Sequence, residues 1–531
     1  MLHAFYDSSD GGIFHMSLLK NGYLPAFLAG AVCVFGFAPF GFFPIPVIAL
    51  AILFALWQRA NTPRNAAWLG YAFGLGLFGA GVSWIYVALH EYGDMPMLLA
   101  LPATALFVAF LALFSALAGY AQARFPVTQS LRTLLVMPAA WVSVEWLRGM
   151  IFTGFPWLTL GYAHSGSPLA GYAPLFGVYG VSLVAAVSAG LLAYCANLLR
   201  EPMTALRGTR SFATSLRGIY LPLLMLVALW GAGAALHRVS WTKPVGEPFS
   251  VALVQGNIAQ NLKFSEDALA GTLETYRRLV LQSNARLTLL PETALPMLRH
   301  EVPQDLTEQL RDHALKNRGD DLIGVFERDN GSYYNSVFSL GAGDEQHYRK
   351  HHLVPFGEFI PLRPLLGWFI NGVLDIPMGD LARGDARQAP LDVAGQRVGV
   401  DICYEDVFGE EIIRALPQAT LLANFTDDAW YGHSYAAAQH NQMSQMRAME
   451  TGRMMLRATN TGITSIIGAD GRILQRLPQH VEAVLLGKAR GYGGTTPYVR
   501  WGNAAVWLLI MLMLAGAWLA DQRNAISSRN P

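Results

Sequence analysis

Apolar stretches of helix length fill most of the first 240 residues, and they constrain the fold more than any other feature. A helix needs about 20 apolar residues to cross a bilayer. Candidate spans lie at residues 22–38, 43–57, 66–90, 96–122, 133–150, 170–199, 218–236 and 502–520. Pro39, Gly41, Pro44 and Pro46 interrupt the chain between the first two. The sequence therefore predicts a membrane α-helical bundle of about eight transmembrane helices.

Charge is distributed unevenly between this apolar part and the rest of the chain. Only 14% of the residues are charged, against about 25% in a typical soluble protein. The charged residues gather between positions 239 and 500. We therefore expect an N-terminal transmembrane domain (1–238, seven spans), an extramembrane domain (239–500) and a C-terminal helix with its tail (501–531). The net charge of +1 gives no electrostatic reason to expect a nucleic-acid partner.

Arginine placement in the short loops predicts the orientation of the bundle. Cytoplasmic loops are enriched in Lys and Arg. Basic residues follow the even-numbered spans and the last span, at Arg59, Arg64, Arg124, Arg132, Arg200, Arg207, Arg210, Arg217, Arg523 and Arg529. The alternate loops have almost none, and Arg148 is the main exception. Both termini are therefore expected in the cytoplasm, with residues 239–500 on the opposite side.

The extramembrane domain alternates β-rich runs with helical stretches. Strands are predicted at 249–258, 287–293, 320–327, 334–341, 397–405 and 419–430, and a helix at 267–285. Residues 440–459 are predicted as a helix running into a strand, and residues 462–477 as a hairpin turning at Asp470-Gly471. The pattern indicates a layered α/β sandwich.

Three reactive side chains follow strands of this domain: Glu292, Lys350 and Cys403. The other two cysteines, Cys33 and Cys195, lie inside predicted spans, so Cys403 has no disulfide partner to expect. A thiol needs a base to react, and a lysine can stabilise the oxyanion formed on a carbonyl. The trio is sufficient for acyl transfer through a thioester. Spacing alone leaves open that Cys403 is a small buried hydrophobe, because any α/β domain of this size offers such a trio.

The motifs around these residues resemble a known family. LPET, YRKHHLVPFGEFIP and ICYED resemble the signature blocks of the nitrilase superfamily, which has an αββα sandwich and a Glu–Lys–Cys triad. A nitrilase-like domain between a seventh and an eighth span resembles the apolipoprotein N-acyltransferase family. SWIYVALHEYG, VEWLRGMIFTGFPWLTLGY and NFTDDAWYG extend the resemblance across residues 22–520. By this resemblance Glu292 is the general base, Lys350 the oxyanion stabiliser and Cys403 the nucleophile.

The resemblance also implies substrates and a location. Enzymes of this family act in the bacterial inner membrane, with the catalytic domain on the periplasmic side. They take the sn-1 acyl chain of a phospholipid, typically phosphatidylethanolamine, through a thioester on the cysteine. They place it on the α-amino group of the diacylglyceryl-cysteine that begins an apolipoprotein, the last step of lipoprotein maturation. No metal or organic cofactor is implied.

Further residues match family positions near the site: Phe264, Glu358, Tyr404, Glu405, Asn424, Asp428 and Trp430. Glu358 is expected either to assist the triad or to be a salt-bridged loop acid, and Tyr404 either to act beside the nucleophile or to pack as an aromatic. Asn424, Asp428 and Trp430 either order a loop or contact substrate. Phe264 and Leu290 stand where the family often has Trp, which bears on lid dynamics or acyl preference.

Other features carry weaker expectations. His351 and His352 are interpreted as loop residues and His440 as structural, since metal sites need several convergent ligands. Glu145 and Arg148, at a span end, predict an interfacial ion pair or a lipid-headgroup contact. Trp84, Trp141, Trp146 and Trp157 predict an interfacial aromatic belt or, for some of them, the lining of a lateral entry for acyl chains. The apolar segment 362–378 is interpreted as a lipid-facing lid over Cys403, or as a loop packed in the core.

Two other functions remain open at this point. One is a membrane-tethered amidase that releases a small acid into water, which gives the spans no role beyond anchoring. The other is a transporter or receptor with an inactive nitrilase-like binding domain. Transport paths use intramembrane ionisable residues, and few such residues occur here beyond Glu145 and His90 near span ends.

Overall fold

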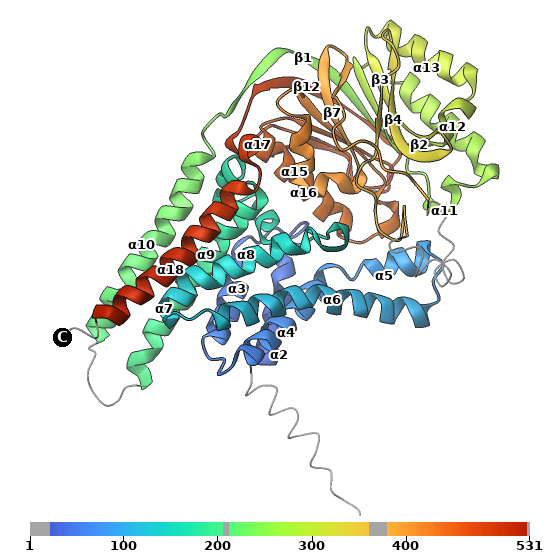
Figure 1. Ribbon diagram of the computed structural model, residues 1–531. Helices are drawn as coiled ribbons and strands as arrows, with labels where there is room; N and C mark the ends of the chain where they lie inside the picture. The colour runs from blue at the N-terminus through green and yellow to red at the C-terminus, as the bar shows by residue number, and fades with distance from the viewer. Residues whose placement is uncertain (1–21, 205–211, 361–379, 528–531) are drawn as a thin grey trace, which may run out of the picture.

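A helical bundle and an α/β domain make up the protein, with the α/β domain standing on one end of the bundle (Figure 1). The computed structural model describes residues 22–204, 212–360 and 380–527. The bundle comprises α2 (Tyr23–Val32), α3 (Pro44–Trp57), α4 (Pro63–Gly81), α5 (Ile85–Val87), α6 (Met97–Arg124), α7 (Gln129–Leu131), α8 (Met137–Arg148), α9 (Ala173–Thr204), α10 (Phe212–Leu236) and α18 (Ala504–Ser527).

Helices occur at all eight places where spans are predicted, but they differ in length. Four are long and apolar enough to cross a membrane: Met97–Arg124, Pro168–Leu199, Gly218–Leu236 and Ala504–Ile526. A fifth crossing results if Pro63–Gly81 and Ile85–Tyr92, bent by 58°, form one span. Tyr23–Gly36 and Pro44–Trp57 are shorter apolar helices. Length and composition thus support four or five crossings among the described residues rather than eight.

The predicted span 133–150 departs most from a simple crossing. It contains a π-helical turn (Arg132–Val136) followed by the 12-residue helix α8. Glu145 and Arg148 on α8 are both 3% exposed. Charged side chains in a membrane segment usually face the interior of the bundle. The burial of Glu145 and Arg148 therefore places this face of α8 inside the bundle rather than against lipid.

Close backbone contacts hold the helices of the bundle together. A Cβ at Gly76 of α4 would lie 2.0 Å from the Phe27 carbonyl oxygen of α2. On the opposite side, a Cβ at Gly70 would lie 2.2 Å from the Ser115 carbonyl oxygen of α6. Glycine on α4 therefore lets both neighbours approach at backbone distance, as small residues do in membrane helices.

The α/β domain consists of two six-stranded sheets, ordered β12-β1-β2-β3-β4-β5 and β11-β10-β9-β8-β7-β6. The first sheet contains β1 (Thr242–Gln255), β2 (Leu287–Leu298), β3 (Asp320–Asp329), β4 (Ser332–Gly341), β5 (His347–Arg349) and β12 (Ala483–Gly494). The second contains β6 (Leu391–Val393), β7 (Gln396–Ile402), β8 (Leu421–Thr426), β9 (Met455–Thr459), β10 (Ser465–Ile467) and β11 (Ile473–Arg476).

Helices cover the outer faces of both sheets and complete an αββα sandwich, as predicted. Helices α12 (Glu266–Leu281) and α13 (Gln304–Lys316) pack on the first sheet, and α16 (Ala436–Thr451) packs on the second. Apolar side chains of β1, β2, β7 and β8 fill the space between the sheets. The expected hairpin at 462–477 is also confirmed, with β10 and β11 antiparallel.

Helix α16 lies between the second sheet and the membrane bundle and carries much of the domain contact. The Glu450 carboxylate accepts a hydrogen bond from the Val178 backbone N–H of α9 at 2.7 Å. At the other end of α16, the Gln442 side chain bonds Ser165 and the Ala38 backbone N–H at 3.1 and 3.0 Å. The α/β domain therefore packs directly against the bundle through α16.

Two expectations about the span ends are wrong. Glu145 accepts hydrogen bonds from the Trp141 indole and the Leu160 N–H, and Arg148 donates to the Phe155 and Trp157 carbonyls. Burial excludes a headgroup contact. Glu145 is bonded to Trp141 on α8 and to the loop after α8, and Arg148 is bonded to that loop, so both side chains hold the loop backbone.

The aromatic belt is the second wrong expectation. Trp84, Trp141 and Trp157 are 3%, 5% and 0% exposed, so they pack inside the protein, and Trp146 packs edge-on against Trp507. The Trp157 indole donates to Gln439 of α16 at 2.6 Å. Trp157 therefore lies at the junction of the two domains.

Candidate active site

Cys403 is the first residue after β7, as the sequence predicts, and its backbone is in the left-handed region with φ of 55°. That conformation is costly for a residue with a side chain and is kept only where surrounding contacts impose it. Those contacts are hydrogen bonds to the Cys403 carbonyl from Asn424 Nδ2 at 3.2 Å and His440 Nε2 at 3.3 Å. The strand end and its turn thus present the thiol in a fixed direction.

The structure brings Glu292 and Lys350 together. Lys350 Nζ lies 3.2 Å from Glu292 Oε1 and 2.8 Å from Glu358 Oε1, and its side chain is 1% exposed. Glu292 belongs to β2 and Lys350 follows β5. The Cys403 thiol interacts electrostatically with both Glu292 and Lys350.

Protonation states in this site follow from burial and from the neighbouring charges. Burial raises the pKa of the Cys403 thiol well above its ordinary value, Glu292 adds to this, and Lys350 opposes it. Burial alone lowers the pKa of Lys350, but the carboxylates of Glu292 and Glu358 more than compensate, and the pKa is raised. These pKa directions favour a protonated Cys403 thiol and a charged Lys350 ammonium. A protonated thiol needs a base to become nucleophilic.

Glu358 contacts Lys350 directly. We call Glu292, Lys350 and Glu358 the reactive cluster. Its second oxygen accepts a hydrogen bond from the Val354 N–H at 2.8 Å. Asn335 on β4 donates to both acids, at 2.8 Å to Glu292 and 3.3 Å to Glu358. Asn335 is not among the residues predicted from the sequence. A polar residue in the otherwise buried strand YNSVFSLG is the signal that points to it.

Glu405 joins the loop that contains Lys350 to the turn that begins at Cys403. Its Oε1 accepts hydrogen bonds from the N–H groups of His351 and His352 at 2.7 and 2.9 Å. Its Oε2 accepts from the Ile402 N–H at 2.7 Å and from the Tyr348 hydroxyl at 3.0 Å. Glu405 is therefore a positioning residue that fixes Lys350 relative to Cys403.

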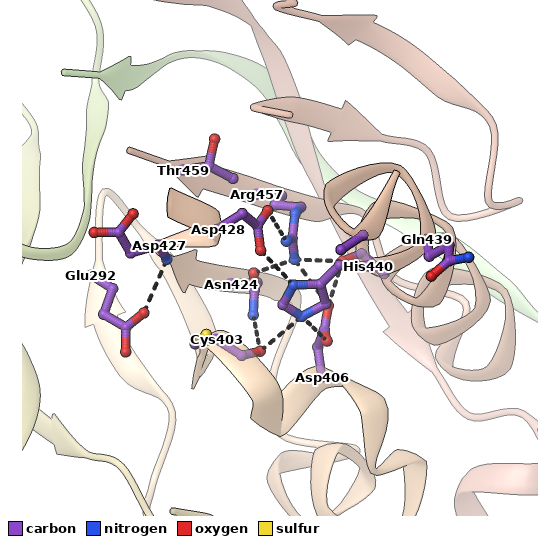
Figure 2. A network of polar contacts seen from close by, with 12 residues as sticks. Glu292, Cys403, Asp406, Asn424, Asp427, Asp428, Gln439, His440, Arg457 and Thr459 are labelled. Atoms are coloured by element: carbon purple, nitrogen blue, oxygen red, sulfur yellow. Dashed lines mark hydrogen bonds and ion pairs between the residues drawn. The ribbon is translucent and has the colours of Figure 1, made fainter. Parts of the chain in front are cut away.

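A second charge cluster lies on the other side of Cys403 (Figure 2). His440 is hydrogen-bonded to Asp428 through Nδ1 at 2.8 Å and to Asp406 through Nε2 at 2.9 Å. Arg457 is ion-paired with the same two carboxylates, at 3.2 Å to Asp406 and 3.0 Å to Asp428. It also donates to Asn424 Oδ1 at 2.6 Å. The cluster holds the two side chains that bind the Cys403 carbonyl.

The charges of this second cluster balance. Burial and Arg457 lower the pKa of His440, but Asp406 and Asp428 outweigh them and raise it to about 9. Burial raises the pKa of each aspartate, yet His440 and Arg457 bring both below their ordinary values. His440 is structural, as expected. Neither Asp406 nor Arg457 is among the site residues predicted from the sequence. Arginine on a strand is usually exposed, so the strand position of Arg457 does not indicate a buried role.

Tyr404 packs against the membrane domain. Its hydroxyl donates to the Gly154 carbonyl at 3.0 Å, and its ring stacks on Trp157 with centroids 6.4 Å apart. Trp430 is half-buried and meets Tyr92 of the bundle edge-on. Tyr404 therefore packs as an aromatic at the domain junction, where Trp430 also lies. A role of either residue toward substrate stays a prediction.

The two family departures lie in different surroundings. Phe264 is 39% exposed, at the end of the short helix α11 (Gln260–Lys263), and contacts Phe326. Leu290 is fully buried in the core beneath α12 and α13. The predicted lid, 362–378, lies outside the described residues.

The neighbouring histidines have other partners than a metal. His351 Nδ1 is hydrogen-bonded to the Gly384 carbonyl at 2.9 Å. His352 Nδ1 contacts Glu411 at 3.2 Å, and its ring stacks on Phe408. Across residues 22–204, 212–360 and 380–527, no group of three or more His, Cys, Asp or Glu side chains could hold a metal ion.

Known protein families match both domains of the chain. Residues 29–191 match the apolipoprotein N-acyltransferase N-terminal domain, and residues 250–491 match carbon-nitrogen hydrolase. The chain is 50% identical over 509 residues to the apolipoprotein N-acyltransferase of Nitrosomonas europaea, covering 94% of this chain and 98% of that one. It is 43% identical over 510 residues to the enzyme of Ralstonia nicotianae, covering 94% and 93%.

Solved structures match the α/β domain at lower similarity. A carbon-nitrogen hydrolase superfamily protein from Xanthomonas campestris, with an arsenic adduct in its active site, is 17% identical. The match covers 50% of this chain and 97% of that chain, with a TM-score of 0.35.

Proposed function

The chain belongs to the apolipoprotein N-acyltransferase family, and from that premise we propose how its residues carry out the reaction. The family membership makes it a membrane acyltransferase of lipoprotein N-acylation. The proposal is that Cys403 takes an acyl chain from the sn-1 position of a phospholipid and holds it as a thioester. The chain then passes to the α-amino group of a diacylglyceryl-cysteine.

In the first half-reaction, Glu292 removes the proton of the Cys403 thiol as the sulfur attacks the ester carbonyl. A C–S bond forms, and the carbonyl electron pair moves to oxygen, where the Lys350 ammonium stabilises it. Collapse of this intermediate breaks the ester C–O bond. Glu292 returns the proton to the leaving oxygen, and a lysophospholipid departs.

In the second half-reaction, the neutral amine of the lipoprotein attacks the thioester carbonyl. A C–N bond forms, Lys350 again stabilises the oxyanion, and Glu292 takes the proton that the amine loses. Breakage of the C–S bond restores the sulfur of Cys403, which is reprotonated from Glu292. The products are an amide and the free enzyme, so the cycle needs no cofactor.

One observation carries this proposal: a fully buried ammonium, Lys350, held between two carboxylates beside a protonated thiol. The direct packing of the α/β domain on the membrane bundle is consistent with lipid substrates. Moving a two-chain phospholipid into water exposes tens of methylenes at about 0.8 kcal/mol each. A thiol at the membrane surface avoids that cost.

Location and donor identity form the remainder of the proposal. The arginines of the even loops favour a cytoplasmic side opposite residues 239–500. We place the protein in the bacterial inner membrane with its catalytic domain in the periplasm and with phosphatidylethanolamine as the donor. Labelling of an introduced exposed cysteine at Lys316 by a membrane-impermeant maleimide in intact spheroplasts tests the orientation. Protection of that site until the membrane is lysed would contradict it.

A two-stage experiment tests the reaction. Detergent-solubilised protein is mixed with phosphatidylethanolamine labelled in the sn-1 chain, first without an acceptor. We expect release of about one lysophospholipid per enzyme, followed by transfer of the label to an added diacylglyceryl-cysteine peptide. A matched sample labelled in the sn-2 chain should leave the enzyme unlabelled.

Other outcomes distinguish the alternatives. Continuous release of free fatty acid without an acceptor would indicate a hydrolase. No release of lysophospholipid from a folded protein would indicate an inactive binding domain. The Cys195→Ala variant, which alters a buried cysteine outside the site, should behave as the wild type.

A further inference from the structure

A second buried lysine, Lys263, lies directly behind Glu292, and the mechanism above does not use it. Its residue is 2% exposed. The ammonium forms an ion pair with Asp427, which is also buried, and donates a hydrogen bond to the Glu292 backbone carbonyl at 3.0 Å. Burying a charged pair costs free energy unless its contacts are excellent. The position of the Lys263–Asp427 pair beside Glu292 therefore indicates a functional role.

The backbone at Glu292 is irregular where Lys263 binds it. The register between β2 and β3 shifts between Leu290 and Leu295. Thr293, the next residue after the base, has φ of 46°. An irregular strand loses regular ladder partners, and the Lys263 ammonium supplies one for the Glu292 carbonyl. Lys263 therefore helps to fix the backbone from which the base projects.

The same ion pair also fixes the side chain of Glu292. The Asp427 backbone N–H donates to Glu292 Oε2 at 3.0 Å (Figure 2), while Oε1 faces Lys350. Asp427 is held in turn by Lys263 and by Asn460 Nδ2, at 3.2 and 3.3 Å to its two oxygens. One oxygen of the base thus faces Lys350 and the other faces a backbone group that the Lys263–Asp427 pair anchors.

We propose that Lys263 is a positioning residue for the base, acting through the Glu292 carbonyl and through Asp427. The inference rests on the proposed function, in which Glu292 carries out the proton transfers of both half-reactions. It differs from a purely structural role in one consequence. Loss of Lys263 slows both half-reactions by similar factors, since the same misplaced base serves both.

Charge gives a second consequence. Burial raises the pKa of Asp427, and Lys263 opposes that rise. Removing the ammonium leaves the Asp427 carboxylate uncompensated beside Glu292, and the neighbouring like charge favours proton uptake by Asp427. The other charged and titratable groups around Asp427 and Glu292 are Lys350, Glu358, Cys403, Tyr92, Tyr276 and Tyr431. The acidic limb of the pH–rate profile is therefore expected at higher pH in a Lys263→Met variant.

The test measures lysophospholipid release without acceptor and label transfer to the peptide, each per folded protein and across pH 5 to 9. Lys263→Met should lose about 100-fold in both steps, the lower range of a general base's contribution, with the acidic limb shifted upward. Lys263→Arg should retain activity within about tenfold, because it keeps the charge. Lys316→Met, at an exposed lysine of α13, is the matched control and should equal the wild type.

A double variant keeps the inference testable if Lys263→Met folds poorly. Removing both charges relieves the unpaired carboxylate, so Lys263→Met/Asp427→Asn should fold better than Lys263→Met and restore the wild-type acidic limb. Wild-type rates and pH profile in Lys263→Met, or unequal loss confined to one half-reaction, would overturn the inference. If wild type and Lys316→Met release no lysophospholipid, the proposed function itself fails.

Discussion

Two buried charge clusters flank Cys403, and they differ in how their charges balance. The reactive cluster places one ammonium, Lys350, between the two carboxyl groups of Glu292 and Glu358. The supporting cluster pairs Asp406 and Asp428 with His440 and Arg457, two charges of each sign. A charge-balanced cluster of buried ion pairs and hydrogen bonds is suited to holding a backbone in place. A cluster with a carboxyl in excess retains the capacity to accept a proton.

The comparison predicts that changes in the reactive cluster affect the rate more than the stability. Lys350→Met removes the proposed oxyanion partner and leaves two carboxyl groups facing each other. We expect a loss of about 10³-fold in acyl transfer, the upper range for one such donor. The measurement is label transfer per folded protein, with exposed Lys488→Met as the control. Loss of less than tenfold would remove Lys350 from the mechanism.

Changes in the supporting cluster should affect stability instead. Arg457→Met leaves Asp406 and Asp428 with a single cation in a fully buried site. Breaking a buried ion pair from one side costs about 3–5 kcal/mol, and we expect a destabilisation of that order in detergent-based unfolding experiments. The fraction that remains folded should keep activity within about tenfold. Full stability together with a large loss of rate would reverse the assignment of the two clusters.

The charge of His440 predicts a specific dependence of stability on pH. Its pKa rises from 6.5 to about 9 in the folded protein, so folding favours the protonated form. The stabilisation is complete below about pH 6.5 and disappears as pH rises to about 9. The raised pKa corresponds to about 3 kcal/mol. Thermal unfolding from pH 6 to 10 should show this loss in wild type.

A His440→Gln variant isolates that contribution. It lacks the titrating group, so its stability should change less between pH 6.5 and 9, while titrations elsewhere remain common to both proteins. Parallel curves for the two proteins would show that His440 is neutral in the folded state. In that case the supporting cluster would carry an excess negative charge, and the contrast with the reactive cluster would weaken.

The smallest expected effect concerns the contact between the nucleophile turn and the membrane domain. Tyr404→Phe removes the hydrogen bond to the Gly154 carbonyl and keeps the stacked ring. One such bond contributes about 1 kcal/mol, so the unfolding free energy should fall by about that amount and turnover by less than tenfold. A loss of lysophospholipid release above 100-fold at unchanged stability would instead place the hydroxyl in the chemistry.

The reactive cluster was predictable from sequence, and the supporting cluster was not. Glu292, Lys350 and Cys403 follow strands in motifs that resemble a known family, so local pattern carries the information. Arg457 lies on a strand where arginine normally indicates an exposed face, and only tertiary packing pairs it with two aspartates distant in the sequence. Asn335 was missed for a related reason, because a single amide in a strand has no motif of its own.

The membrane part shows the same limit. Hydropathy located the helices correctly, but it treats each apolar run as a complete crossing. Helices α2 and α3 are shorter than that, and α8 is buried with its charged residues bonded to a loop. Trp157 fits an interfacial belt by composition, yet its indole bonds α16 at the domain junction. Such contacts depend on how the domains dock, which local sequence patterns do not encode.

The most direct test of the central claim is to locate the acyl chain on the protein. The wild type and Cys403→Ala are incubated with phosphatidylethanolamine and no acceptor, then examined by intact-protein and tandem mass spectrometry before and after hydroxylamine. We predict one fatty-acyl adduct in the wild type, mapped to Cys403, removed by hydroxylamine and missing from the variant. An adduct on another residue, or lysophospholipid release with no hydroxylamine-labile adduct, would contradict a Cys403 thioester.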